Sequence, residues 1–136
     1  MYHIIDNIYL SNLLDAENFS LIKANNIGVV CRLSEDTNTS IYGSSIAFHN
    51  FEVEDNVLSV NDMIVAAKTI SLLIDNTARN VLIHCNEGQS RSVSVIIYHM
   101  ITKCGFSFNT ALEHIKNIKS DVRPNNSFER KLRSIC

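Results

Sequence analysis

The sequence predicts a single α/β domain in which a mostly parallel, twisted sheet of about five strands is flanked by helices. Short runs rich in β-branched and aromatic residues alternate with segments whose apolar residues recur at helical spacing. No internal repeat or Pro/Gly-rich linker divides the chain, which has only 4 Gly and 1 Pro. With 136 residues and 46% hydrophobic content, the chain can bury a core without disulfides or metals. We therefore expect one domain over residues 1–136.

The expected strands are short apolar runs. They lie at 4–5, 8–10, 27–33, 46–51 and 81–83. Asp6 and Asn7 offer a turn between the first two runs, and the polar, Gly-containing stretch 34–45 separates the next two. Residues 81–83 form a continuous Val-Leu-Ile run, which is typical of a strand buried on both faces.

The expected helices carry apolar residues on one face. They lie at 13–24, 61–79, 91–103, 107–119 and 127–135. Residues that can cap their N-termini are Ser11 or Asn12, Ser59 or Asn61, Ser107 and Asn126. Gly105 can end the third helix, and Pro124 breaks the pattern before the last one. Strands and helices therefore interleave along the whole chain.

The segment 84–92, His-Cys-Asn-Glu-Gly-Gln-Ser-Arg-Ser, joins a buried strand to a helix. A tight loop before a helix N-terminus turns backbone N–H groups inward and adds the positive end of the helix dipole, so it can bind an anion such as phosphate. The expected phosphate-binding residues are Asn86, Glu87, Gly88, Gln89, Ser90 and Arg91. We expect an anion site that is local to this loop.

Cys85 stands at the start of that loop and is the candidate nucleophile, because the local field favours the thiolate. Arg91 offers a planar fork that can bind two phosphate oxygens. The Ser92 hydroxyl can donate to the sulfur and stabilise it as a leaving group. A structural buried cysteine is the competing interpretation of Cys85. The joint occurrence of strand, Cys, Gly, Arg and helix at these spacings favours the nucleophile.

The pattern His-Cys-x5-Arg-Ser after a hydrophobic strand resembles the signature of the protein tyrosine phosphatase superfamily. The chain is similar to its small dual-specificity branch, including viral members of the vaccinia type. Residues 7–11 resemble the opening strand of that branch, Asp15-Ala16 its first helix, and Arg123-Pro124-Asn125 with Phe128 and Leu132 its closing motif. The resemblance implies metal-independent hydrolysis of phosphotyrosine and phosphoserine or phosphothreonine in proteins, through a phosphocysteine and without a cofactor.

Expelling the leaving group requires a proton, and a positioned acid contributes ~10²–10⁴-fold to such a step. The resemblance implies that the acid is Asp55, in the loop between a strand and the longest helix. Glu54 is the nearest alternative, and the other carboxylates of this stretch are interpreted as a solvated acidic surface. The resemblance also implies that His84 shapes the loop and tunes the thiolate.

The composition argues against several partners. A formal charge of −2 and a pI near 6.2, without a run of Lys or Arg, give no footprint for nucleic acid or an anionic membrane. The nearly apolar stretch 93–101 is too short to span a bilayer. Four widely spaced cysteines without metal spacing predict no metal site and a reducing compartment, namely the cytoplasm, or the host cytoplasm or virion for a viral protein. Cys31 and Cys104 are interpreted as packing residues.

Other interpretations remain open. Related loops serve phosphoinositides and RNA 5′-triphosphates, although here no lysine lies inside the loop and Glu87 repels a highly anionic group. A rhodanese-type sulfur transferase and a non-catalytic phosphoprotein-binding module are further alternatives.

The basic group Arg130, Lys131 and Arg133 is interpreted either as a solvated face or as a surface that attracts an acidic phosphopeptide. A monomer is preferred over a homodimer, because the chain lacks the N-terminal helix that some viral relatives use to dimerise. Tyr98-His99-Met100 departs from the family's Tyr-Leu-Met, which predicts changed packing there.

Overall fold

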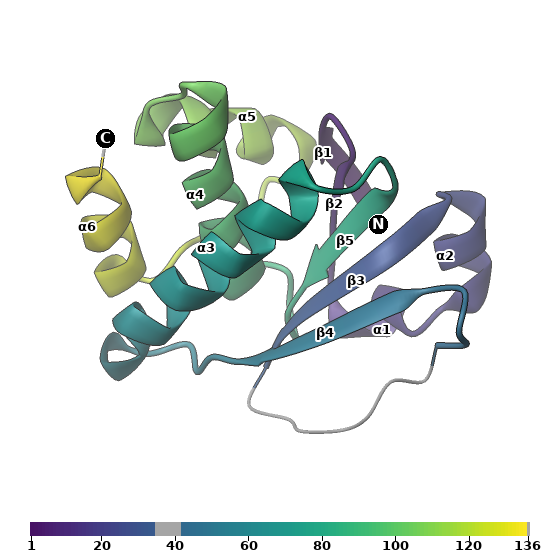
Figure 1. The fold of residues 1–136 in the computed structure, drawn as a ribbon. Helices are drawn as coiled ribbons and strands as arrows, with labels where there is room; N and C mark the ends of the chain where they lie inside the picture. Colours follow the sequence, from purple (N-terminus) through teal and green to yellow (C-terminus); the bar gives the residue numbers. More distant parts are fainter. Residues whose placement is uncertain (35–41, 136) are drawn as a thin grey trace.

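The computed structural model describes residues 1–34 and 42–135, so Cys136 and part of the predicted linker 34–45 lie outside the described residues. The elements are β1 (Tyr2–Ile5), β2 (Ile8–Ser11), α1 (Leu13–Ala16), α2 (Phe19–Ala24), β3 (Ile27–Ser34), β4 (Ala47–Glu52), the 3₁₀ turn η1 (Val57–Ser59), α3 (Val60–Asp75), β5 (Asn80–His84), α4 (Arg91–Cys104), α5 (Phe108–Ile118) and α6 (Asn126–Ser134). Figure 1 shows their arrangement around one sheet.

The five strands form one sheet in the order β1-β2-β5-β3-β4. Only β1 and β2 pair antiparallel; β5 pairs parallel with both β2 and β3, and β3 pairs parallel with β4. The predicted mostly parallel sheet is therefore confirmed. Strand β5 lies at its centre, where two neighbours and helices on both faces bury it, which explains its continuous apolar run.

Helices cover both faces of this sheet. Figure 1 shows α3 to α6 on one side and the short α1 and α2 on the other. Alternate residues of β5 serve the two sides: Val81 and Ile83 join the large core beneath α3 and α4, whereas Leu82 joins the small core with Ala16 and Ile22. The sheet is thus fixed between two cores.

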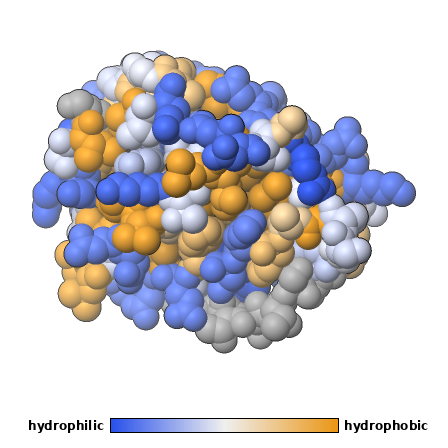
Figure 2. Space-filling view, viewed as in Figure 1, coloured by the Kyte–Doolittle hydropathy of each residue, from blue (hydrophilic) through white to orange (hydrophobic). Residues whose placement is uncertain are grey.

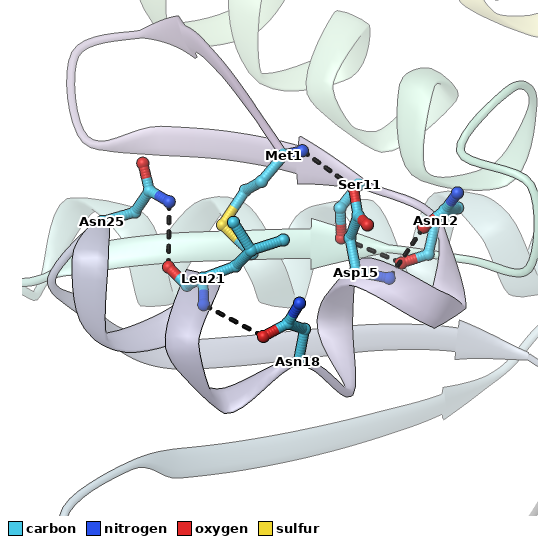
Figure 3. Close-up of polar contacts among 7 residues, drawn as sticks. All are labelled: Met1, Ser11, Asn12, Asp15, Asn18, Leu21 and Asn25. Carbon is cyan, nitrogen blue, oxygen red and sulfur yellow. Dashed lines mark hydrogen bonds and ion pairs between the residues drawn. The ribbon is translucent and has the colours of Figure 1, made fainter.

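Three predicted helices have different ends in the structure. The helix expected over 13–24 is two helices, because the side chain of Asn18 accepts hydrogen bonds from the N–H groups of Ser20 and Leu21 and starts a new helix (Figure 3). Helix α3 ends at Asp75 rather than at 79, where the Asn76 side chain donates to a carbonyl of the last turn. The cap of α6 is Asn125, not Asn126.

The residue that departs from the family pattern, His99, lies between α3 and α4. Its Nδ1 is 2.7 Å from the Ser71 hydroxyl oxygen, and both side chains are buried. A polar pair in a core stabilises only when each member has a partner, as here. The changed packing expected at this position therefore takes the form of a hydrogen bond between two helices.

Among the described residues, one segment, Val57–Asp75, has the length and hydropathy to cross a membrane. Core helices of globular proteins meet the same criterion, and α3 buries Met63, Ala67 and Ile70 against the sheet and α4. Its apolar character is accounted for by that packing.

Candidate active site

The loop of residues 85–90 follows the carboxyl end of the central strand. The ends of β2 and β3 lie on either side, since Ser11 and Arg32 both pair with His84. In open sheets with parallel strands, ligands bind outside these strand ends. The helix α4 begins at Arg91, directly after the loop, so its positive N-terminal end faces the same place.

Backbone N–H groups of residues outside the loop donate to three of its carbonyl groups. Asn86 O accepts from Leu13 N–H at 2.9 Å, Gln89 O from Arg123 N–H at 2.6 Å and Ser90 O from Ser94 N–H at 2.8 Å. In a trans peptide the N–H of the next residue points opposite to the carbonyl. The N–H groups of Glu87, Ser90 and Arg91 therefore point to the concave side of the loop, which is the arrangement that binds anions.

Gly88 makes the tight curve of the loop sterically feasible. Its φ is +70°, in the left-handed region that favours glycine. A Cβ placed there would lie 2.9 Å from the carbonyl oxygen of Ser11, at the end of β2. Any larger residue would push the loop away from the strand end, so glycine is required at this position for two reasons.

The start of α1 holds the loop in place through a backbone hydrogen bond. Figure 3 shows the Met1 amino group in an ion pair with the Asp15 carboxylate, at 2.9 Å. The same figure shows Asn12, whose side-chain oxygen accepts from Asp15 N–H at 2.9 Å and caps the helix. Leu13, whose N–H donates to the loop, lies between Asn12 and Asp15 in the chain. The helix cap and the ion pair therefore hold Leu13 in place.

Cys85 and Ser92 are brought together beneath the loop. The Cys85 side chain is only 3% exposed, and its Sγ lies 3.2 Å from Ser92 Oγ. That distance allows the hydroxyl to donate to a thiolate. Cys31 differs: burial in β3 raises the pKa of its thiol to about 12, so it stays protonated and packs in the core.

Arg91 is anchored to the loop that carries the candidate acid. Its guanidinium is largely buried, and Nη1 donates to the carbonyl oxygen of Val53 at 3.0 Å. Val53 follows β4 and precedes Asp55 by two residues. The contact fixes the direction of the side chain and joins the phosphate-binding loop to the Asp55 loop.

Asp55 is held against the phosphate-binding loop by two donors. Its Oδ1 accepts from the Ser90 hydroxyl at 2.7 Å and from the Asn125 side-chain amide at 2.8 Å. The backbone N–H of Asn125 donates to Ser90 Oγ at 3.0 Å and closes a three-residue network. Glu54 instead accepts from the side-chain amide of Asn56. Of the two candidate acids, only Asp55 contacts the loop.

Asn125 is the site residue that the sequence reasoning missed. Its position in the closing motif Arg123-Pro124-Asn125 predicts no role in the site. Its contact with Asp55 spans 70 residues, and no local spacing reports such a pair. The usable signal in the sequence is an Asn directly after Pro124 and before a helical pattern. That signal marks a helix cap but does not indicate the contact with Asp55.

The remaining predicted loop residues contribute mainly through their backbone. The side chains of Asn86 and Glu87 are exposed, whereas Gly88 is buried. The Gln89 amide points outward and donates to the Asp121 carboxylate at 3.1 Å. Over the described part of the chain, no cluster of three or more His, Cys, Asp or Glu is arranged to hold a metal ion.

His84 ends β5 directly before the candidate nucleophile Cys85 and is almost fully buried. Its Nδ1 lies 3.4 Å from the carbonyl oxygen of Cys85. Burial lowers the pKa of this imidazole from 6.5 to about 4; the Cys85 carbonyl opposes that shift and the Arg32 charge adds to it. The ring is neutral at pH 7 and supports the loop by packing and hydrogen bonding.

The neutral His84 makes stability depend on pH. Because its pKa is about 4 in the folded chain and near 6.5 in the unfolded one, the unfolded chain binds more protons between these values. Stability is therefore lost as the pH falls below 6.5, by about 2 kcal/mol between pH 7 and pH 5. Denaturant unfolding at both pH values measures this loss. The variant His84→Gln should show a loss smaller by that amount, and an equal loss in both proteins would contradict the prediction.

Known proteins share the sequence pattern and the fold of this chain. The family model of the dual specificity phosphatase catalytic domain matches residues 8–135. Protein phosphatase Slingshot homolog 1 of Mus musculus is 26% identical over 132 residues, which cover 95% of this chain and 12% of that protein. Putative tyrosine-protein phosphatase R622 of Acanthamoeba polyphaga mimivirus is 39% identical over 56 residues, or 41% of this chain and 26% of that protein. The viral relative gives weak support to the resemblance to viral members.

The fold has close neighbours among solved structures. The crystal structure of human DUSP28 superimposes with a TM-score of 0.85 at 14% identity, over 99% of this chain and 94% of that one. Identity this low shows a shared fold alone. The chain spans only a small part of the length of the curated relatives above. Because the family model covers nearly all of the 136 residues, the chain belongs to the dual specificity phosphatase catalytic domain family.

Proposed function

We propose that the protein hydrolyses phosphotyrosine and phosphoserine or phosphothreonine in proteins, through a phosphocysteine at Cys85. One observation carries the proposal: the Cys85 sulfur lies 3.2 Å from Ser92 Oγ, at the start of a loop to which Arg91 and Asp55 are both attached. A nucleophile, a phosphate-binding cation and an acid meet at one strand end. Membership of the family supports the same activity.

In the first step the loop N–H groups and Arg91 hold the phosphate, and the Cys85 thiolate attacks phosphorus. The S–P bond forms as the bond from phosphorus to the substrate oxygen breaks. Asp55, protonated in the enzyme that begins the cycle, gives its proton to that oxygen, and the dephosphorylated side chain leaves. Since Ser90 and Asn125 both donate to Oδ1, the other carboxyl oxygen is the one that carries the transferred proton.

In the second step water attacks the phosphocysteine. The Asp55 carboxylate, now without its proton, accepts one from the water, and the electron pair of the S–P bond returns to sulfur. The hydroxyl of Ser92 stabilises that thiolate by donating to it. Inorganic phosphate leaves, and the thiolate and the protonated Asp55 are restored.

A shallow site would accept both kinds of phosphoresidue. The segment that carries Asp55 is short, running only from Val53 to Asn56 between β4 and η1. The inference of dual specificity rests on this feature together with the family.

The test is phosphate release from matched phosphotyrosine and phosphothreonine peptides, in the presence of a chelator. Release from both peptides is the expected result. Release from neither by folded protein would refute the proposal, and tight binding of both peptides would then favour a non-catalytic phosphoprotein-binding module. Release from only one peptide would refute the dual specificity and keep the cysteine mechanism.

The variant Asp55→Asn is expected to lower kcat on a phosphopeptide by about 10²–10⁴-fold while changing KM little. An amide keeps the shape of the side chain but cannot transfer the proton. Steady-state kinetics on phenyl phosphate and p-nitrophenyl phosphate check the role, because the nitrophenolate leaves readily without a proton and should lose much less rate. Glu54→Gln, in the same segment, is the matched control and should keep the wild-type rate. Equal losses on both aryl phosphates would remove Asp55 from the proton transfer.

A further inference from the structure

A groove lies beside the candidate active site, between η1 and α6. It has a volume of about 310 Å³ and is lined by Val57, Val60, Ser127, Arg130, Lys131 and Ser134. Both of its walls start at the site. Asp55 and Asn125, which are hydrogen-bonded at 2.8 Å, each precede a lining residue by two positions. The groove is therefore continuous with the place where the proton transfer is proposed.

One wall of the groove is apolar and exposed. Val57 is 66% exposed, and Leu58, beside it on η1, is 88% exposed. Figure 2 shows hydrophobic atoms gathered at the lower left, where Figure 1 places the start of α3. Exposed apolar side chains that adjoin a functional site commonly mark a contact surface. Val57, together with Val60 on the same wall, is positioned to contact a substrate residue close to the phosphorylated one.

The opposite wall is positively charged. Among the described residues, neither Arg130 nor Lys131 lies in a salt bridge, and no carboxylate lines the groove. Arg133, the third member of the basic group, behaves differently: it pairs with Glu129 at 3.2 Å and lies 4.4 Å from the centroid of the Phe108 ring. The structure thus separates two cations that face the groove from one that stabilises α6.

We propose that this groove binds the protein substrate beside its phosphorylated residue, where it selects an apolar side chain together with an acidic one. The apolar side chain packs on Val57 and Val60, and the carboxylate pairs with Arg130 or Lys131. The lining residues Val57 and Ser127 lie two residues from Asp55 and Asn125, and two residues of extended chain span at most about 7 Å. Substrate positions two to four residues from the phosphorylated one are therefore expected to reach the groove. This inference rests on the proposed function, because the phosphate fixes the position of the peptide.

Four phosphotyrosine peptides test the inference. Two carry Leu and Glu at positions two to four, on the N-terminal or the C-terminal side, and their partners carry Ser and Gln at the same positions. Wild type should favour one Leu/Glu peptide over its partner by about tenfold in kcat/KM, and the preference should shrink as salt is raised, because exposed charges are screened. Val57→Ser and the double variant Arg130→Gln/Lys131→Gln should each reduce that preference by about threefold or more.

Matched controls separate this effect from general changes in the surface. Val65→Ser removes another exposed valine, in α3 and outside the groove, and Lys23→Gln/Lys68→Gln removes two cations elsewhere. Both controls should keep the wild-type preference. Equal rates on matched peptides, with p-nitrophenyl phosphate still hydrolysed by wild type, would overturn the groove and leave the proposed function standing. Absence of hydrolysis of p-nitrophenyl phosphate would refute the proposed function itself and the groove with it.

Discussion

Replacing Cys85 with serine is expected to abolish phosphate release, with kcat/KM on a phosphopeptide lower by about 10⁴-fold or more. In the proposed mechanism the thiolate forms the bond to phosphorus in the first step and is the leaving group in the second, and a serine hydroxyl is not ionised at pH 7. The substitution exchanges one sulfur for one oxygen in a side chain that is 3% exposed, so the loop around it should stay folded. Phosphate release and acid-quench trapping of labelled phosphoenzyme measure the two consequences.

A second cysteine provides the control for that experiment. Cys104, half-buried at the end of α4, lies in the same helix that follows the loop but outside the site. Cys104→Ser should therefore keep both the rate and the trapped phosphoenzyme. Wild-type release by Cys85→Ser would disprove the phosphocysteine. Loss of release with an intact trapped intermediate would show that another residue carries the phosphate.

Arg91→Lys is expected to lower kcat/KM by about 10³-fold and to weaken inhibition by inorganic phosphate. A lysine keeps the charge but loses the planar fork that binds two phosphate oxygens at once. It also loses the geometry of the contact with the Val53 carbonyl, which orients the side chain toward the Asp55 loop. The expected loss is therefore in the transition state and in ground-state binding together.

Arg123→Lys is the matched control, because Arg123 is exposed and contacts the loop through its backbone N–H, which the change preserves. Steady-state kinetics and phosphate inhibition constants should match those of wild type for this variant. A thermal melt of each protein separates lost folding from lost chemistry. If folded Arg91→Lys retained wild-type phosphate inhibition, the guanidinium would not be the phosphate ligand.

The parts of the site that are contiguous in sequence were predictable. The strand, the loop 85–90 and the helix that follows are local, because apolar runs, a glycine at a positive φ and a helix pattern each leave a mark at fixed spacing. The order of the strands was less accessible. Placing β5 between β2 and β3 depends on which faces must be buried, a property of the whole chain rather than of one segment.

Some of the positions that sequence reasoning misjudged or missed are decided by tertiary contacts. Asn125 and Asn126 are equally good caps for α6 by residue type, and Asn125 takes the role in a structure where it also contacts Asp55 and Ser90. The groove between η1 and α6 likewise joins segments about 70 residues apart, as the contact from Asp55 to Asn125 shows. Val57 and Arg130 line the same groove, although no short window of the sequence contains both.

The side-chain amide of Asn125 has both of its polar atoms committed to different tasks. Its oxygen accepts from Phe128 N–H and starts α6, while its nitrogen donates to the carboxylate of Asp55. The folding of the C-terminal helix and the placement of the proposed proton donor are consequently linked: fraying of α6 would remove one of the two hydrogen bonds that hold Asp55 and leave the one from Ser90. The first turn of α6 therefore helps to position Asp55, because the residue that caps this helix also binds the carboxylate.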